Sequence, residues 1–165
     1  MTIKFHNKGF LTKNIILALE KRFGKNKIIA NFKPANANLF KNILALTHNI
    51  KEAREITNIS VIDDRSAEKA AKLLYKKFSS SIILTRGDRG MTIYKKNYDV
   101  RHVPAFATKV MDVTGASDTV ISVIALMLAS GFDVIEAATL ANKAAGLVVG
   151  KEGTATISIN ELEKL

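Results

Sequence analysis

The residues with the clearest chemical potential are 112–119, which read DVTGASDT and precede an apolar stretch. Small residues at 115–117 would let a ligand approach the backbone, and the first N–H groups of a following helix would point outward. Such amides form a site for a phosphate or a developing anion. Asp118 would lie in the first helical turn, where its carboxylate could accept a proton from an attacking hydroxyl. Ordinary helix capping by Ser117 or Asp118 explains the same residues equally well.

Three further segments place polar residues at turns or helix starts. Residues 47–52 (THNIKE) fit a capping box with Asn49 and Glu52 as its two members. Residues 85–90 (TRGDRG) form a glycine turn after a strand, as hairpins often do. Residues 141–146 carry an asparagine on an alanine-rich helix. Taken alone, these three segments favour a structural role over a ligand site.

The elements that must position these residues follow from hydrophobic periodicity and caps. Helices are predicted at 13–23, 50–57, 67–78, 116–129, 134–149 and 160–165, with Thr12 capping the first and Ser66 the third. Strands are predicted at 27–31, 43–47 and 81–85, and a β-hairpin at 91–95 and 98–103. The inward-facing residues are predicted to be Ile15, Ile16, Leu19 and Phe23 in the first helix and Ala70, Leu73, Leu74 and Phe78 in the third.

The alternation of helices with short apolar strands predicts an α/β fold with a mostly parallel sheet. Ligands of such sheets bind in the loops where strands lead into helices, which is where the polar segments fall. The helix at 116–129 is apolar nearly all round, so we expect it to be buried.

Composition sets wider limits. The 165 residues are 47% hydrophobic, which predicts one folded domain over 1–165. There is no cysteine, and the three histidines are scattered without metal-ligand spacing. The net charge of +10 comes from lysines spread along the chain, which favours a solvated surface and makes nucleic acid an unlikely partner. No segment has the features of a signal peptide or a membrane span, so we expect a cytoplasmic protein without a membrane partner.

The motifs together resemble the ribokinase (PfkB) superfamily of carbohydrate kinases. Its D-x-x-G-A-G-D motif is matched by Asp112, Gly115, Ala116 and Asp118. The resemblance implies that Asp118 is the catalytic base and that the amides of Gly115, Ala116 and Ser117 form the anion hole. Ser117 stands where the family has glycine, so a Cβ occupies a place of close backbone approach.

The resemblance extends to the nucleotide-binding residues. Residues 47–52 resemble the family's T-P-N-x-x-E, with His48 in place of proline, and residues 85–90 resemble its T-x-G-x-x-G turn. The implied nucleotide-binding residues are Asn49, Glu52, Thr85, Gly87, Gly90 and Asn142. The implied cofactors are ATP and Mg²⁺, with Glu52 acting on the metal through water.

Two further stretches resemble the heptose-7-phosphate kinase branch of this superfamily. Residues 31–36 (NFKPAN) resemble D-P-K-P-x-N, and residues 5–12 (FHNKGFLT) resemble D-Y-x-K-G-x-L-T. Asn31 and Phe5 replace the two aspartates of these patterns. The resemblance implies phosphorylation of a sugar phosphate of the heptose type, in the biosynthesis of lipopolysaccharide precursors.

The resemblance also implies that the chain is the C-terminal, nucleotide-binding half of a kinase roughly twice as long. We expect a partial ribokinase-like fold without the sugar-binding half and lid. Because half a sheet exposes an edge strand and an apolar face, self-association or pairing with a separately encoded half is expected. A sugar phosphate would bind only with that half present. Three hypotheses stay open: a truncated or split kinase, an inactive remnant that at most binds nucleotide, and a basic nucleotide- or nucleic-acid-binding module.

Overall fold

Six short strands, each too short to be stable alone, pair into one sheet. A computed structural model describes residues 1–4, 12–95, 100–106 and 110–165. The strands are β1 (Thr2–Lys4), β2 (Ile29–Asn31), β3 (Ala45–Asn49), β4 (Ser81–Thr85), β5 (Met91–Tyr94) and β6 (Arg101–Val103), and they lie in the order β1-β2-β3-β4-β5-β6. The three adjacent pairs β1–β2, β2–β3 and β3–β4 are parallel. The predicted α/β fold with a mostly parallel sheet is confirmed.

Most helices begin at a residue whose side chain accepts a first-turn N–H. They are α1 (Lys13–Phe23), α2 (Ile50–Thr57), α3 (Asp64–Phe78), α4 (Ala116–Ala129), α5 (Val134–Val149) and α6 (Ile159–Leu162). Thr12 caps α1 as predicted, and α2, α3, α5 and α6 each begin with a reciprocal capping box. Helix α4 is the exception, because its N-cap is Gly115.

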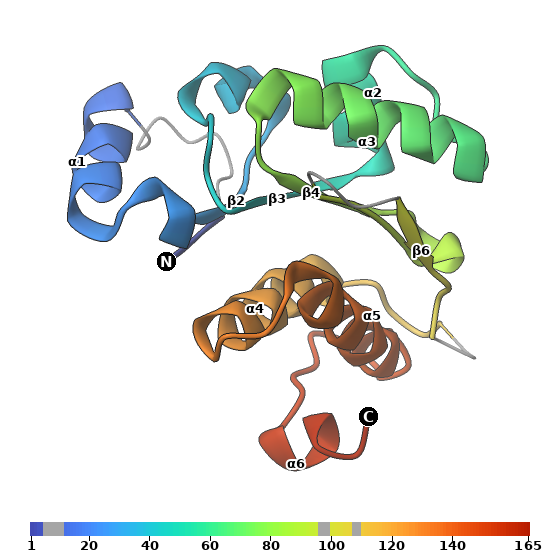
Figure 1. Ribbon diagram of the computed structural model, residues 1–165. Coiled ribbons are helices and arrows are strands. Elements are labelled where there is room, and N and C mark those ends of the chain that lie inside the picture. The colour runs from blue at the N-terminus through green and yellow to red at the C-terminus, as the bar shows by residue number, and fades with distance from the viewer. Residues whose placement is uncertain (5–11, 96–99, 107–109) are drawn as a thin grey trace. The chain divides into compact units, whose positions relative to one another are not determined.

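The chain folds into two compact units. The first unit comprises Met1–Thr85 and Thr92–Arg101, and the second comprises Arg86–Met91 and His102–Leu165. In the first unit, α1, α2 and α3 lie on one face of strands β2 to β4 (Figure 1). In the second unit, α4 and α5 pack side by side.

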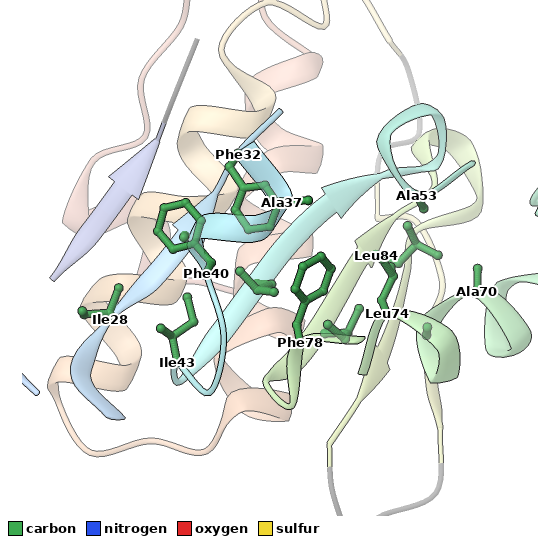
Figure 2. Close-up of a cluster of buried hydrophobic side chains, with 14 of the residues drawn as sticks. Ile28, Phe32, Ala37, Phe40, Ile43, Ala53, Ala70, Leu74, Phe78 and Leu84 are labelled. Atoms are coloured by element: carbon green, nitrogen blue, oxygen red, sulfur yellow. The ribbon is translucent and has the colours of Figure 1, made fainter. Parts of the chain in front are cut away.

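The core of the first unit is built around three phenylalanines (Figure 2). Phe32 stacks on Phe40 with ring centroids 4.8 Å apart, and Phe78 meets Phe32 edge-on at 5.6 Å. All three side chains are at most 1% exposed. Their burial, together with the aliphatic residues of α3 and β4, holds the helices on the sheet through the hydrophobic effect.

The apolar helix α4 is only partly buried, which corrects the prediction that this helix would be buried. Val120, Ile121, Val123 and Ile124 are buried, whereas Leu126 is 54% exposed. The buried residues follow the period of a single stripe, as expected of a helix that buries one side.

Two details of the predicted helices were also wrong. Helix α3 starts three residues earlier than predicted, because Asp63 is the N-cap and Ser66 is the third helical residue of the capping box. Leu73 is 45% exposed and Phe23 is 43% exposed, so neither faces the core. Along α3 the buried stripe runs through Ala70, Leu74 and Phe78 at a spacing of four residues, and Leu73 lies about 100° away from Leu74 around the axis.

Several element boundaries also differ from those predicted. Strand β3 ends two residues later than predicted, at Asn49, so that Asn49 is both a strand end and the N-cap of α2. The final helix begins at Ile159 and ends at Leu162. The predicted turn and motif at 5–11 and part of the predicted hairpin, 96–99, lie outside the described residues.

Candidate functional site

The N-terminus of α4 carries Asp118 in its first turn. Gly115 precedes the helix in the left-handed conformation, with φ +84°, and makes no side-chain cap hydrogen bond. The side chains of Ser117 and Asp118 are exposed. Ser117 therefore does not serve as the N-cap, and the helix presents its partial positive charge without the capping side chain that the other described α-helices have.

The turn before α4 is fixed by backbone hydrogen bonds. The N–H groups of Met111 and Asp112 donate to Val149 O at 2.7 and 3.2 Å, which ties this turn to the end of α5. Asp112 Oδ1 accepts from Thr114 N at 2.8 Å, and hydrogen bonding from Thr114 lowers the pKa of Asp112. Asp112, the first residue of the motif, thus shapes the turn and stays ionised.

One of the three predicted anion-hole amides already has a partner. Ala116 N–H donates to Val113 O at 3.2 Å, near the long end of the range for such bonds. A ligand oxygen at the Ala116 amide would therefore share it with Val113.

A loop after α5 lies beside Gly115. A Cβ built on Gly115 would meet Thr154 Cγ2 at 3.7 Å and Ala155 O at 3.8 Å. Lys151 holds this loop, because its Nζ donates to Thr156 O at 3.0 Å and to Glu161 Oε1 at 2.8 Å. The structure therefore brings the loop that contains Thr154 and Ala155 and the 112–118 motif together within the second unit.

The first unit brings Asn49 and Glu52 together at the junction of β3 and α2. Asn49 Oδ1 accepts from Glu52 N at 2.9 Å, and Glu52 Oε2 accepts from Asn49 N at 3.1 Å. The capping box predicted for these two residues is confirmed. Lys33, from the loop after β2, donates to Glu52 Oε1 at 2.8 Å.

The Glu52 carboxylate is buried but strongly ionised. Burial by itself raises its pKa, but His48, Lys33 and the Asn49 N–H outweigh burial and lower the pKa to about 2. His48 Nδ1 lies 3.8 Å from Glu52 Oε2, so His48 acts on the Glu52 carboxylate as a nearby polar ring and not through a formed hydrogen bond. Both ring nitrogens of His48 are buried without a hydrogen-bond partner.

Glu52 fits a magnesium ion only through water. No group of three or more His, Cys, Asp or Glu side chains comes together in the part of the chain that the structure describes. Both Glu52 oxygens already accept hydrogen bonds, one from Lys33 and one from Asn49. A single ionised carboxylate in this setting suits Mg²⁺ that keeps its own waters.

Thr85 lies beside Asn49 at the carboxyl edge of the sheet. The two residues are Cα partners in the parallel β3–β4 ladder, and Thr85 Oγ1 donates to His48 O at 3.3 Å. Asn49, Glu52 and Thr85 therefore cluster where two neighbouring parallel strands end, which is the edge where α/β sheets bind ligands.

Gly90 and Asn142 meet the same stretch of backbone in the second unit. A Cβ on Gly90 would lie 2.0 Å from Val103 O and 2.6 Å from Ala105 N, so only glycine fits there. Asn142 Nδ2 donates to Pro104 O at 2.7 Å, and Asn142 is 7% exposed. Gly87 lies in the preceding turn, with open space around its Cβ position. Gly90 and Asn142 thus each make a contact within the protein that does not depend on a ligand.

Sequence reasoning assigned no role to Lys33, although it lies within the 31–36 segment that was singled out. The sequence around it offers only a lysine between a phenylalanine and a proline.

The helices of the described part of the chain are all too short or too polar to span a membrane.

The chain is similar in sequence to curated bacterial proteins. It is 37% identical over 161 residues to the bifunctional protein HldE of Syntrophotalea carbinolica, covering 95% of this chain and 33% of that protein. It is 39% identical over 142 residues to the bifunctional protein HldE of Actinobacillus succinogenes, covering 86% of this chain and 30% of that protein. The chain therefore spans about a third of the length of these relatives.

Solved structures share the fold. A ribokinase from Arabidopsis thaliana, complexed with ribose and ATP, has a TM-score of 0.82 at 18% identity over 99% of this chain and 54% of its own. A ribokinase from Thermotoga maritima has a TM-score of 0.77 at 25% identity over 99% of this chain and 55% of its own. Residues 7–161 match the pfkB family of carbohydrate kinases. With this match over most of its length, the chain belongs to the pfkB carbohydrate kinase family.

Proposed function

We propose that this chain binds ATP with Mg²⁺ and supplies the base and anion hole for transfer of the γ-phosphoryl group to a sugar or sugar-phosphate hydroxyl. The observation that carries the proposal is the α4 N-terminus, where a helix without a side-chain cap holds Asp118 in its first turn. Membership of the pfkB carbohydrate kinase family supports the same chemistry.

In this proposal, Asp118 takes the proton of the acceptor hydroxyl as that oxygen attacks the γ-phosphorus. The bond between the γ-phosphorus and the bridging oxygen to the β-phosphate breaks, and ADP leaves. The amides of Gly115, Ala116 and Ser117, together with the helix dipole, stabilise the negative charge on the transferring group. Most of the catalysis in such a reaction comes from positioning and electrostatics.

Nucleotide-binding roles are assigned within each compact unit separately. Asn49, Glu52 and Thr85, from the first unit, serve the phosphates and the hydrated Mg²⁺. From the second unit, Gly87 and Gly90 form the turn along the nucleotide and Asn142 lies close to adenine or ribose. The hydrogen bond from Asn142 to Pro104 O supports a rigid wall at that position.

The proposed acceptor is a heptose 7-phosphate. The motifs at 31–36 and 5–12 support this choice, as do relatives that are bifunctional HldE proteins. Because this chain spans about a third of those relatives, we assign the sugar-binding residues to a complementary half of the kinase fold. We also propose that this chain pairs with that half or associates with itself.

The first test is calorimetric titration of the purified chain with ATP and Mg²⁺. We expect saturable binding of ATP. The Asp118→Asn variant should bind ATP with nearly the same affinity, because a base for the acceptor hydroxyl contributes little to ground-state nucleotide affinity. With a complementary half added, transfer to heptose 7-phosphate should be lost in Asp118→Asn. Turnover by Asp118→Asn at the unchanged rate would refute the base assignment.

Ser117 gives the alternative of an inactive nucleotide binder a specific test. Its Cβ and hydroxyl stand where the family motif has glycine, so Ser117→Gly should improve phosphate binding if the serine obstructs the hole. Weaker phosphate binding in Ser117→Gly would show instead that the hydroxyl donates to the ligand. Absence of ATP binding by the folded chain and by Ser117→Gly would favour the inactive remnant.

A further inference from the structure

Lys33 stands out because its ammonium group lies against a buried carboxylate while much of its side chain remains in solvent. Lys33 Nζ is 2.8 Å from Glu52 Oε1, and the side chains are 47% and 5% exposed, respectively. An ammonium group has three donor hydrogens, and the Glu52 contact uses one of them. The exposed part of Lys33 can therefore meet a second, anionic group.

The fold fixes the backbone of Lys33 on both sides. Asn31, the last residue of β2, donates through Nδ2 to Thr47 O at 2.9 Å, which locks the end of β2 to β3. Phe32 is fully buried in the aromatic core, and Pro34 begins a 3₁₀ helix directly after Lys33. The side chain of Lys33 thus extends from an anchored loop, and its flexible stem is the part able to adjust to a ligand.

The surroundings of Glu52 make Lys33 its main side-chain partner. His48 lies on the other side of the carboxylate at 3.8 Å, and its ring packs against Phe32, with centroids 4.9 Å apart. The remaining donor is the backbone N–H of Asn49. Glu52 lies at the start of helix α2. Among the described groups that contact its carboxylate, Lys33 is the exposed cation.

We propose that Lys33 is a further positioning and phosphate-binding residue, which fixes the Glu52 carboxylate and offers its remaining donors to a polyphosphate anion. This inference rests on the proposed function, because it places the polyphosphate of a nucleotide beside Asn49 and Glu52. A lysine between a carboxylate and a phosphate is chemically suited to the task, because it neutralises the repulsion between the two anions while bonding to both.

The test compares three single variants of the full chain. Lys33→Met removes the charge and keeps the stem, Lys33→Arg keeps the charge, and Lys72→Met is the matched control. Lys72 also pairs with a glutamate, at 3.6 Å from Glu68, but both side chains are exposed on α3. Binding of inorganic tripolyphosphate and of ATP with Mg²⁺ is measured by calorimetry, and the Glu52 carboxyl carbon is titrated by NMR.

Lys33→Met should weaken binding of tripolyphosphate about tenfold, the loss expected for one charge-assisted hydrogen bond. Its Glu52 carboxyl should titrate at higher pH than in the wild type, because a positive neighbour has been removed. Lys33→Arg should retain most of the affinity, and Lys72→Met should match the wild type. Tripolyphosphate affinity in Lys33→Met equal to that in Lys72→Met overturns the proposal, even if the Glu52 titration moves, because Lys33 is then only a structural ion pair.

The two proposals fail separately. Tripolyphosphate binding that depends on Lys33, in a chain that transfers no phosphoryl group with any complementary half, leaves Lys33 in place and refutes the kinase activity. Phosphoryl transfer by the wild-type chain, together with unchanged nucleotide affinity in Lys33→Met, supports the kinase activity and refutes the role of Lys33. A wild-type chain that binds neither tripolyphosphate nor ATP overturns both.

Discussion

Replacing Gly90 by alanine should strongly destabilise the second unit, because no space exists for a Cβ. The new atom would lie 2.0 Å from Val103 O and 2.6 Å from both Pro104 C and Ala105 N, all of them backbone atoms. Gly90 also has φ +71°, a conformation that costs an alanine about 1–3 kcal/mol. Overpacking adds about 1–3 kcal/mol. The expected loss in the free energy of unfolding is therefore about 2–6 kcal/mol.

Gly87 provides the matched control within the same turn. Its φ is +64°, but nothing lies within 4 Å of the position of its Cβ. Gly87→Ala should therefore cost only the backbone strain, about 1–2 kcal/mol. Urea unfolding followed by circular dichroism would give both values, and Gly90→Ala should lose more stability than Gly87→Ala because of its steric clash. A Gly90→Ala variant no less stable than Gly87→Ala would refute the close approach of Gly90 to the 103–105 backbone.

Three other predictions concern stability. Glu52 has a folded pKa of about 2, below the ordinary 4.5, so its ionisation stabilises the fold above about pH 4.5 by roughly 3 kcal/mol, and this contribution is lost as the pH falls toward 2. Glu52→Gln should flatten that acid-induced loss in urea titrations; an identical pH profile in the variant would contradict the assignment. Asp133→Ala removes the N-cap of α5, whose Oδ1 accepts from Ile135 N at 2.8 Å, and should cost about 1 kcal/mol in the same assay, whereas no change would discount the cap. Phe78→Ala, in the aromatic core, should cost about 3–5 kcal/mol, and a loss below 1 kcal/mol would show that the core collapses around the missing ring.

The sequence by itself was sufficient for the elements whose signals are local. The bounds of α1, α2, α4, α5 and β4 agree with those predicted, because apolar periodicity and caps lie within each segment. The Asn49–Glu52 capping box was likewise readable from residues three positions apart. Helix α3 was mispredicted at its start because Asp63 and Ser66 are both good N-caps, and only the backbone conformation decides between them.

Only the tertiary structure decided which distant residues meet. The register of β3 against β4 pairs Asn49 with Thr85, and no local pattern specifies that register. Asn142 reaches Pro104, 38 residues away, and Gly90 crosses the same backbone, so two predicted ligand residues proved to be packed against protein. The contact between the Lys33 ammonium group and Glu52, 19 residues further along the chain, depends on the pairing of β2 with β3, so the sequence alone did not reveal it. Local signals set the elements, whereas contacts between elements depend on burial of the shared core, which no single segment encodes.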